Sequence, residues 1–118
     1  QPRSRGLGDV YKRQPTSIAV DEIRFGGLGD IWVADGYGAS LVHKFNAEGE
    51  YILSIDGSEG SGHFSCPHGI VIDRRKSTPE LYVADRANGR VQVFNLDGDY
   101  LRTFGEEFFT TPSEFAIT

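Results

Sequence analysis

The chain is built from short apolar runs that are separated by turn residues. Runs such as residues 31–35 and 81–85 are rich in Val, Ile, Tyr and Phe, which favour β-strands. Gly49 and Gly98 each follow an acidic residue between two runs, where a hairpin requires a positive φ angle. No stretch combines a helical hydrophobic period with capping residues. The pattern therefore predicts an all-β chain.

The runs come in sets of four, and the set occurs twice. Corresponding runs share residue types and order: 15–20 with 67–72, 31–35 with 81–85, 41–45 with 90–94, and 51–55 with 100–104. Residues 112–117 begin the pattern again, more faintly. The spacing is near the period of propeller blades, about 40 to 50 residues. We predict a β-propeller fragment of about two four-stranded antiparallel blades plus the first strand of a third.

The repeat also predicts the organisation of the chain. We expect a propeller region at 15–118, with blade units at 15–66 and 67–111 and a third blade beginning at 112–118. Residues 1–14 show neither the strand nor the helix period, so we expect a non-native or disordered head that does not pack. A flexible native arm is the alternative. The chain contains no methionine, and we expect a fragment of a longer protein.

Composition and charge exclude several classes of partner. The net charge is −5, and four of the 12 basic residues lie in the first 14 positions, so the remainder would repel phosphate backbones. We expect no nucleic-acid partner. No apolar run approaches the roughly 20 residues that span a bilayer, so we expect no membrane partner. Cys66 is the single cysteine, which leaves the compartment open.

The second set of runs resembles an NHL repeat. The similar segments are the opening Pro67-His68-Gly69-Ile70, residues 81–86, residues 88–94 and the turn Asp97-Gly98. Tryptophan–aspartate propellers share the architecture, but the chain lacks their Trp-Asp ending. The resemblance implies a ring that usually closes with about six blades, so two blades would leave open edges. The implied partners are therefore the missing blades of the parent chain.

Three segments sharpen the resemblance. They are Asp35-Gly36-Tyr37, residues 66–69 and residues 83–90, and they are similar to the peptidyl-α-hydroxyglycine α-amidating lyase (peptidylamidoglycolate lyase) family and its bacterial relatives. The resemblance implies cleavage of a peptidyl-α-hydroxyglycine to a peptide amide and glyoxylate. It also implies a zinc cofactor on the propeller axis, held by histidines from alternate blades. The parent would then be a carbon–nitrogen lyase with a peptide substrate.

The same resemblance assigns roles to three residues. His68 opens a strand that would line the channel, and it would be a zinc ligand. Tyr37 would be the base that takes the α-hydroxyl proton, and Arg86 would hold the charge of the substrate or of the tyrosinate. Both follow second strands, so we expect them at the same mouth as His68. One departure concerns residues 38–41, where the lyases tend to carry a polar turn that ends in arginine.

Structural alternatives exist for each of these residues. His68 could line the channel as a hydrogen-bonded histidine, since zinc needs three or four ligands and the chain offers one good candidate. Tyr37 could cap the blade edge, and Arg86 could pair with Asp85 or Glu80 at the surface.

Other polar residues have simpler interpretations. We predict Asp35 and Asp85 to be turn formers that bond their own backbone, and His43 and His63 to face solvent. Cys66 and His68 lack the third group that a thiol nucleophile or a metal clip needs.

Two functional hypotheses remain open on the sequence. The first is a zinc-dependent lyase in the intact parent, with the isolated fragment inactive. The alternative is a non-catalytic NHL propeller that acts as a protein- or peptide-binding scaffold. The compartment stays open, with a secreted or periplasmic parent as one alternative.

Overall fold

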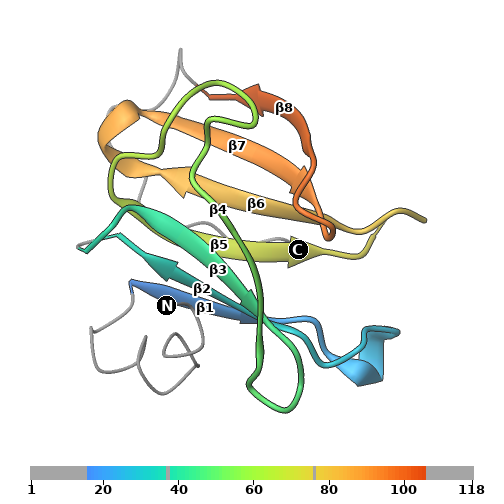
Figure 1. The fold of residues 1–118 in the computed structure, drawn as a ribbon. Helices are drawn as coiled ribbons and strands as arrows, with labels where there is room; N and C mark the ends of the chain where they lie inside the picture. Colours follow the sequence, from blue (N-terminus) through green and yellow to red (C-terminus); the bar gives the residue numbers. More distant parts are fainter. Residues whose placement is uncertain (1–15, 37, 76, 106–118) are drawn as a thin grey trace.

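Two four-stranded antiparallel sheets make up the fold in the computed structural model, which describes residues 16–36, 38–75 and 77–105 (Figure 1). Each sheet follows chain order. The first contains β1 (Ser17–Val20), β2 (Ile31–Asp35), β3 (Leu41–Phe45) and β4 (Tyr51–Ile55). The second contains β5 (Pro67–Asp73), β6 (Glu80–Asp85), β7 (Arg90–Asn95) and β8 (Tyr100–Phe104). The predicted all-β, two-blade fold is confirmed, whereas the predicted head and third blade lie outside the described residues.

The two sheets repeat one another down to single turns. Asn46 closes the β3–β4 hairpin with its side-chain oxygen, which accepts the backbone N–H groups of Glu48 and Glu50. Asn95 does the same in the β7–β8 hairpin, for Asp97 and Asp99. The glycine that follows has a φ of 85° in one hairpin and 89° in the other, as the turn requires. A register shift also interrupts β3 and β7 at matching positions.

Helical structure in the described residues consists of two single 3₁₀ turns. Element η2 (Ile23–Phe25) lies between β1 and β2, and η3 (Arg86–Asn88) lies between β6 and β7. No helix in this part of the chain is long and apolar enough to cross a membrane.

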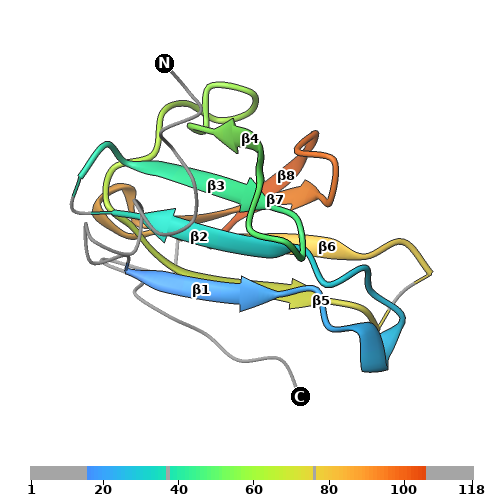
Figure 2. The same cartoon turned by 60° about the horizontal axis from the view of Figure 1, so that its bottom comes forward.

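The two sheets lie against one another (Figure 2), and an apolar core joins their faces. The first sheet contributes Trp32, Ala34, Val42 and Ile55. The second sheet and the connection before it contribute Phe64, Ile70, Leu81, Val83 and Phe94. Phe64 meets the edge of the Phe94 ring, with centroids 5.9 Å apart. Burial of these side chains supplies the main attraction between the sheets.

Polar contacts fix the two sheets at several levels. The Arg74 guanidinium reaches back from the second sheet and makes two hydrogen bonds to the Asp21 carboxylate, of 2.6 and 2.9 Å. Lys44 Nζ donates to the carbonyl oxygen of Leu96 across the interface, at 2.6 Å. These bonds set the relative position of the sheets more tightly than apolar packing alone.

The connection between the sheets binds the outer edge of the second one. Arg90 donates to the carbonyl oxygens of Ser61 and Gly62, and the Gln92 amide accepts from Ser61 N–H and donates to the Gly62 carbonyl. The Ser61 hydroxyl also contacts the Thr103 hydroxyl. The connection at residues 57–62 is thus a bonded part of the second blade.

Candidate functional site

The strand register brings the opening of β5 to the end of β6. Pro67 pairs with Asp85, and Gly69 pairs with Ala84, with a register shift between them at His68. Such a bulge re-aims the side chain of the extra residue, and His68 is half-buried there. Arg86 begins the η3 turn directly after Asp85. His68 and Arg86 therefore lie at the same end of the second blade.

The first blade brings Gly36 to the same mouth. The Gly36 backbone N–H donates to Thr16 Oγ1, and that hydroxyl lies 2.7 Å from the carbonyl oxygen of Pro67 in the next blade. A Cβ atom on Gly36 would overlap the Pro67 oxygen, so only glycine fits. Tyr37, the predicted base, follows Gly36 but lies outside the described residues.

The Asp85 side chain holds together the segments at this end of the second blade. Its buried carboxylate accepts the Ser65 backbone N–H at 2.8 Å, Arg90 Nε at 2.8 Å and Asn88 Nδ2 at 3.1 Å. The prediction of a turn former that bonds its own backbone is therefore wrong for Asp85. The carboxylate instead ties the η3 turn, β7 and the connection together, because a buried charge requires a cation and several donors.

The ion pairs suggested as an alternative role for Arg86 involve carboxylates that other arginines hold. Arg90 pairs with Asp85 at 2.8 Å, and Arg102 pairs with Glu80 at 2.9 Å. Glu80 also lies at the far end of β6, because it pairs with Asp73 rather than with the β5 opening. Asp85 and Glu80 are therefore each held by an arginine other than Arg86.

His43 is a correction to the sequence analysis, because it is fully buried rather than solvent-facing. Its Nδ1 lies 2.6 Å from Ser54 Oγ, and its Nε2 lies 4.0 Å from Asp35 Oδ2. A serine, histidine and aspartate in line can form a nucleophilic triad. Gln92, however, is buried at the matching place of the second blade and donates to Asp85. A glutamine cannot act as a base, so we interpret both side chains as polar supports inside the blade.

His63 faces solvent as predicted, with a side chain 76% exposed. The repeat itself could have exposed the error for His43, since alignment of the two blades matches this residue with Gln92.

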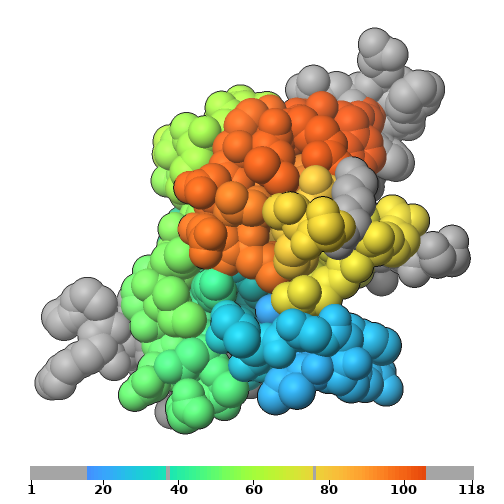
Figure 3. Space-filling view, turned by 90° about the vertical axis from the view of Figure 1, so that its right-hand side faces the viewer, coloured from blue at the N-terminus to red at the C-terminus, as the bar shows by residue number. Residues whose placement is uncertain are grey.

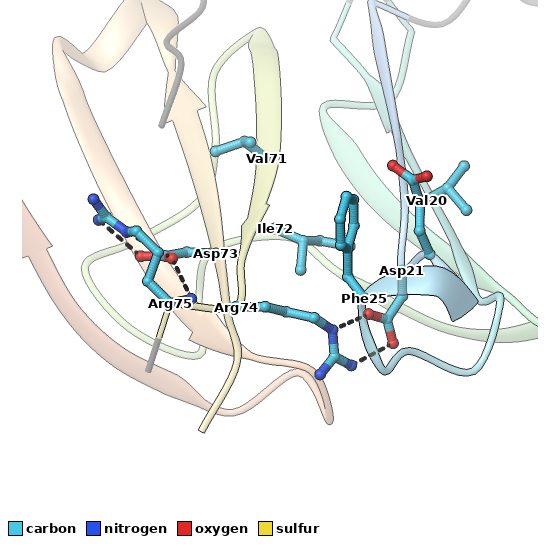
Figure 4. A pocket seen from close by; sticks show the side chains of 9 residues that line it. Val20, Asp21, Phe25, Val71, Ile72, Asp73, Arg74 and Arg75 are labelled. Atoms are coloured by element: carbon cyan, nitrogen blue, oxygen red, sulfur yellow. Dashed lines mark hydrogen bonds and ion pairs between the residues drawn. The ribbon is translucent and has the colours of Figure 1, made fainter. Parts of the chain in front are cut away.

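A separate cavity lies at the opposite mouth. It measures about 500 Å³ and lies between the last residues of β1 and β5 (Figure 4). Its wall is formed by Val20, Phe25, Val71 and Ile72, together with the pairs Asp21–Arg74 and Asp73–Arg75. Figure 3 shows the β1–β2 loop (blue) beside the residues after β5 (yellow) on this side of the molecule. Hydrogen bonds from Arg75 lower the pKa of the Asp73 carboxyl to about 2, so the Asp73–Arg75 pair is ionised at neutral pH.

The described residues do not complete a metal site. They contain no group of three or more His, Cys, Asp and Glu side chains that could hold a metal ion. A zinc ion in a protein usually has three or four protein ligands. His68 can supply one of them from its bulge, and the remaining ligands would have to come from other blades.

Comparison with known proteins identifies the repeat. Residues 64–94, which include the β5 opening, β6, η3 and most of β7, match the NHL repeat family. The chain therefore contains an NHL repeat. This NHL-repeat chain is 35% identical over 107 residues to peptidyl-glycine alpha-amidating monooxygenase A of Xenopus laevis, a match that covers 81% of the chain and 11% of the relative.

Two further relatives are a protein named as a lyase and a protein named only for its NHL repeats. The NHL-repeat chain is 37% identical over 107 residues to peptidyl-alpha-hydroxyglycine alpha-amidating lyase 1 of Drosophila melanogaster, covering 75% of the chain and 18% of the relative. It is 34% identical over 110 residues to NHL repeat-containing protein 3 of Homo sapiens, covering 90% and 29%. The chain thus spans less than a third of the length of each relative.

A solved structure shows the same architecture. The crystal structure of RRP9 WD40 repeats superposes with a TM-score of 0.58 at 18% identity, over 80% of the NHL-repeat chain and 25% of that chain. At this identity the similarity shows the propeller fold alone.

Proposed function

We propose that these two blades form part of the active site of a lyase that cleaves peptidyl-α-hydroxyglycine. The observation that carries the proposal is the position of His68 and Arg86 at one mouth, on segments that are similar to an amidating lyase. His68 would share a zinc ion with ligands from other blades, and the zinc would supply Lewis-acid stabilisation of negative charge.

The residues of this chain have separate tasks in the reaction. Arg86 would hold the carboxylate of the hydroxyglycine, because a guanidinium binds a carboxylate through two N–H groups. Tyr37, as tyrosinate, would remove the proton from the α-hydroxyl group. The C–N bond then breaks, the hydroxyl carbon becomes the aldehyde of glyoxylate, and the leaving amide nitrogen takes a proton to give the peptide amide. One proton leaves the α-hydroxyl group and one is taken up by the amide nitrogen, so the reaction is balanced and requires no oxidant.

The test uses a protein in which these blades complete a closed ring. Glyoxylate release and bound zinc are measured on the same samples. We expect His68→Ala to lower the zinc content, and Tyr37→Phe to retain zinc but lower turnover about a hundredfold or more. Arg86→Ala should impair turnover or substrate binding without unfolding. His63→Ala is the matched control, because this histidine is exposed on the connection and should change neither quantity.

The second candidate function is a scaffold that binds a protein or peptide. The match to NHL repeat-containing protein 3, which covers 90% of the chain, supports it. A closed ring that binds no zinc and releases no glyoxylate would overturn the lyase proposal in favour of this one.

A further inference from the structure

Two serines of the first blade bind the backbone of the second blade on either side of His68. Ser40 Oγ accepts the Cys66 backbone N–H at 3.2 Å, and Ser17 Oγ accepts the Ile70 backbone N–H at 3.3 Å. Both serines are half-buried. The first bond lies before the register shift at His68, and the second lies after it. The bulge that carries this histidine is therefore attached to the neighbouring blade at both of its ends.

A threonine of the first blade binds the same segment between these two points. The Thr16 hydroxyl lies 2.7 Å from the Pro67 carbonyl oxygen and 3.1 Å from that of Ala34, so we assign its single proton to the shorter contact. Pro67 directly precedes His68. We call the three residues Thr16, Ser17 and Ser40 the hydroxyl clamp.

The repeat shows that the clamp occupies the positions of the candidate ligand itself. Ser17 of β1 and Gly69 of β5 each pair with the alanine that precedes the last residue of the next strand. Thr16 therefore stands where the second blade has His68. The residue that opens an inner strand is a candidate metal ligand in one blade, and in the blade before it is a hydroxyl that binds the backbone beside that ligand.

The backbone conformation of Ser40 indicates that its hydroxyl is needed. Ser40 has a φ of 55° just before β3, and the residue just before β7 is Gly89, with a φ of 65°. Glycine adopts this left-handed conformation easily and serine does not. Cys66, which Ser40 binds, has a φ of 57° as well. Such conformations persist where surrounding bonds hold them, and the bond between these two residues links both.

We propose that the hydroxyl clamp holds the β5 opening and thereby positions His68 for metal binding, an inference that rests on the lyase site proposed above. The three hydroxyls act through the backbone, so they are positioning residues. A site works when each group is held within about 0.5 Å of its productive position. Ligands from separate blades meet that demand only if the blades are fixed to one another beside each ligand, and the clamp provides this attachment for His68.

The first test measures amide hydrogen exchange by NMR in a zinc-free closed ring. Ser40→Gly removes the acceptor while glycine keeps the left-handed backbone, so we expect the Cys66 amide to exchange about tenfold faster. Ser17→Ala should have the same effect at the Ile70 amide. Ser54→Ala is the matched control, because this hydroxyl bonds side chains of its own blade and should leave both amides unchanged. Unchanged exchange at either amide in its variant would overturn the proposal.

The second test measures the Kd for zinc by competition with a chelator. Thr16→Val keeps the shape of the side chain and removes the hydroxyl, so we expect its Kd to rise about tenfold, as for other groups that orient a metal ligand. Thr16→Ser keeps the hydroxyl and should retain the wild-type Kd. Ser54→Ala should lower the urea midpoint of unfolding and leave the Kd unchanged. A wild-type Kd in Thr16→Val, or an equal rise in Ser54→Ala, would overturn the positioning role.

The two tests separate this inference from the lyase proposal. In a wild-type ring that binds no zinc, the lyase proposal fails, whereas the exchange rates still decide whether the clamp holds the β5 opening. In a ring that binds zinc and releases glyoxylate while Thr16→Val retains full zinc affinity, the positioning role alone fails.

Discussion

Arg74→Met should show how much the ion pair between the blades contributes to stability. Arg74 makes two hydrogen bonds to Asp21, whose side chain is 3% exposed, while that of Arg74 is 26% exposed. Loss of one partner from a fully buried pair costs about 3 to 5 kcal/mol. Because water reaches part of Arg74, we expect the free energy of unfolding to fall by about 2 kcal/mol.

The single tryptophan provides the assay. Trp32 is fully buried in the core between the sheets, so its emission reports separation of the blades during unfolding in urea. Arg24→Met is the matched control, because Arg24 is 73% exposed and pairs with an exposed glutamate. This control should change stability by less than about 0.5 kcal/mol. The double variant Asp21→Asn with Arg74→Met should recover at least about 1 kcal/mol, since no charge stays buried without a partner. Equal stability of Arg74→Met and Arg24→Met would refute this account of the pair.

The remaining predictions concern a carboxyl group and a buried histidine. The Asp73 carboxyl has its pKa lowered from 3.8 to about 2, mainly by hydrogen bonds from Arg75, so its contribution to stability is complete above about pH 4 and is lost as the pH falls toward 2. Urea unfolding between pH 5 and pH 2 should therefore show a steeper loss of stability for the wild type than for Asp73→Asn; parallel curves would contradict the assignment. His43→Gln should cost less than about 1 kcal/mol because Gln92 fills the matching place, whereas His43→Leu should cost about 2 kcal/mol by removing one of the two partners of the Ser54 hydroxyl, the other being Tyr51. Thermal or urea unfolding of both variants compares them, and equal losses would refute a polar support.

The repeated pattern was sufficient to predict the strands, because strand residues and turn glycines recur in both blades at matching positions. Burial of individual residues was harder to predict. Lys44 on β3 bonds across to the second sheet, and the adjacent His43, which points to the opposite face, lies beside the rings of Phe45 and Tyr51, so both residues are buried. Alternation of polar and apolar residues, which separates an exposed face from a covered one, carries little information in such a strand.

Contacts between distant segments explain the other errors. Asp85 receives its bonds from Ser65, 20 residues earlier, as well as from Arg90, and no local turn pattern signals the first of these. Arg74 and Asp21 are 53 residues apart. The shared mouth of His68 and Arg86, by contrast, follows directly from antiparallel pairing of consecutive strands, which the sequence did indicate.

The connection between the blades has a consequence for how such a unit could be duplicated or transplanted. Covalently it continues the first repeat, but its hydrogen bonds go to Arg90, Gln92 and Asp85 of the second. A gene segment that begins at Pro67 would encode all four strands and leave these buried polar groups without the backbone that satisfies them. A segment that begins near Asp56 would include the loop that forms these hydrogen bonds. The smallest exchangeable unit of this protein is therefore a blade together with the loop that comes before it.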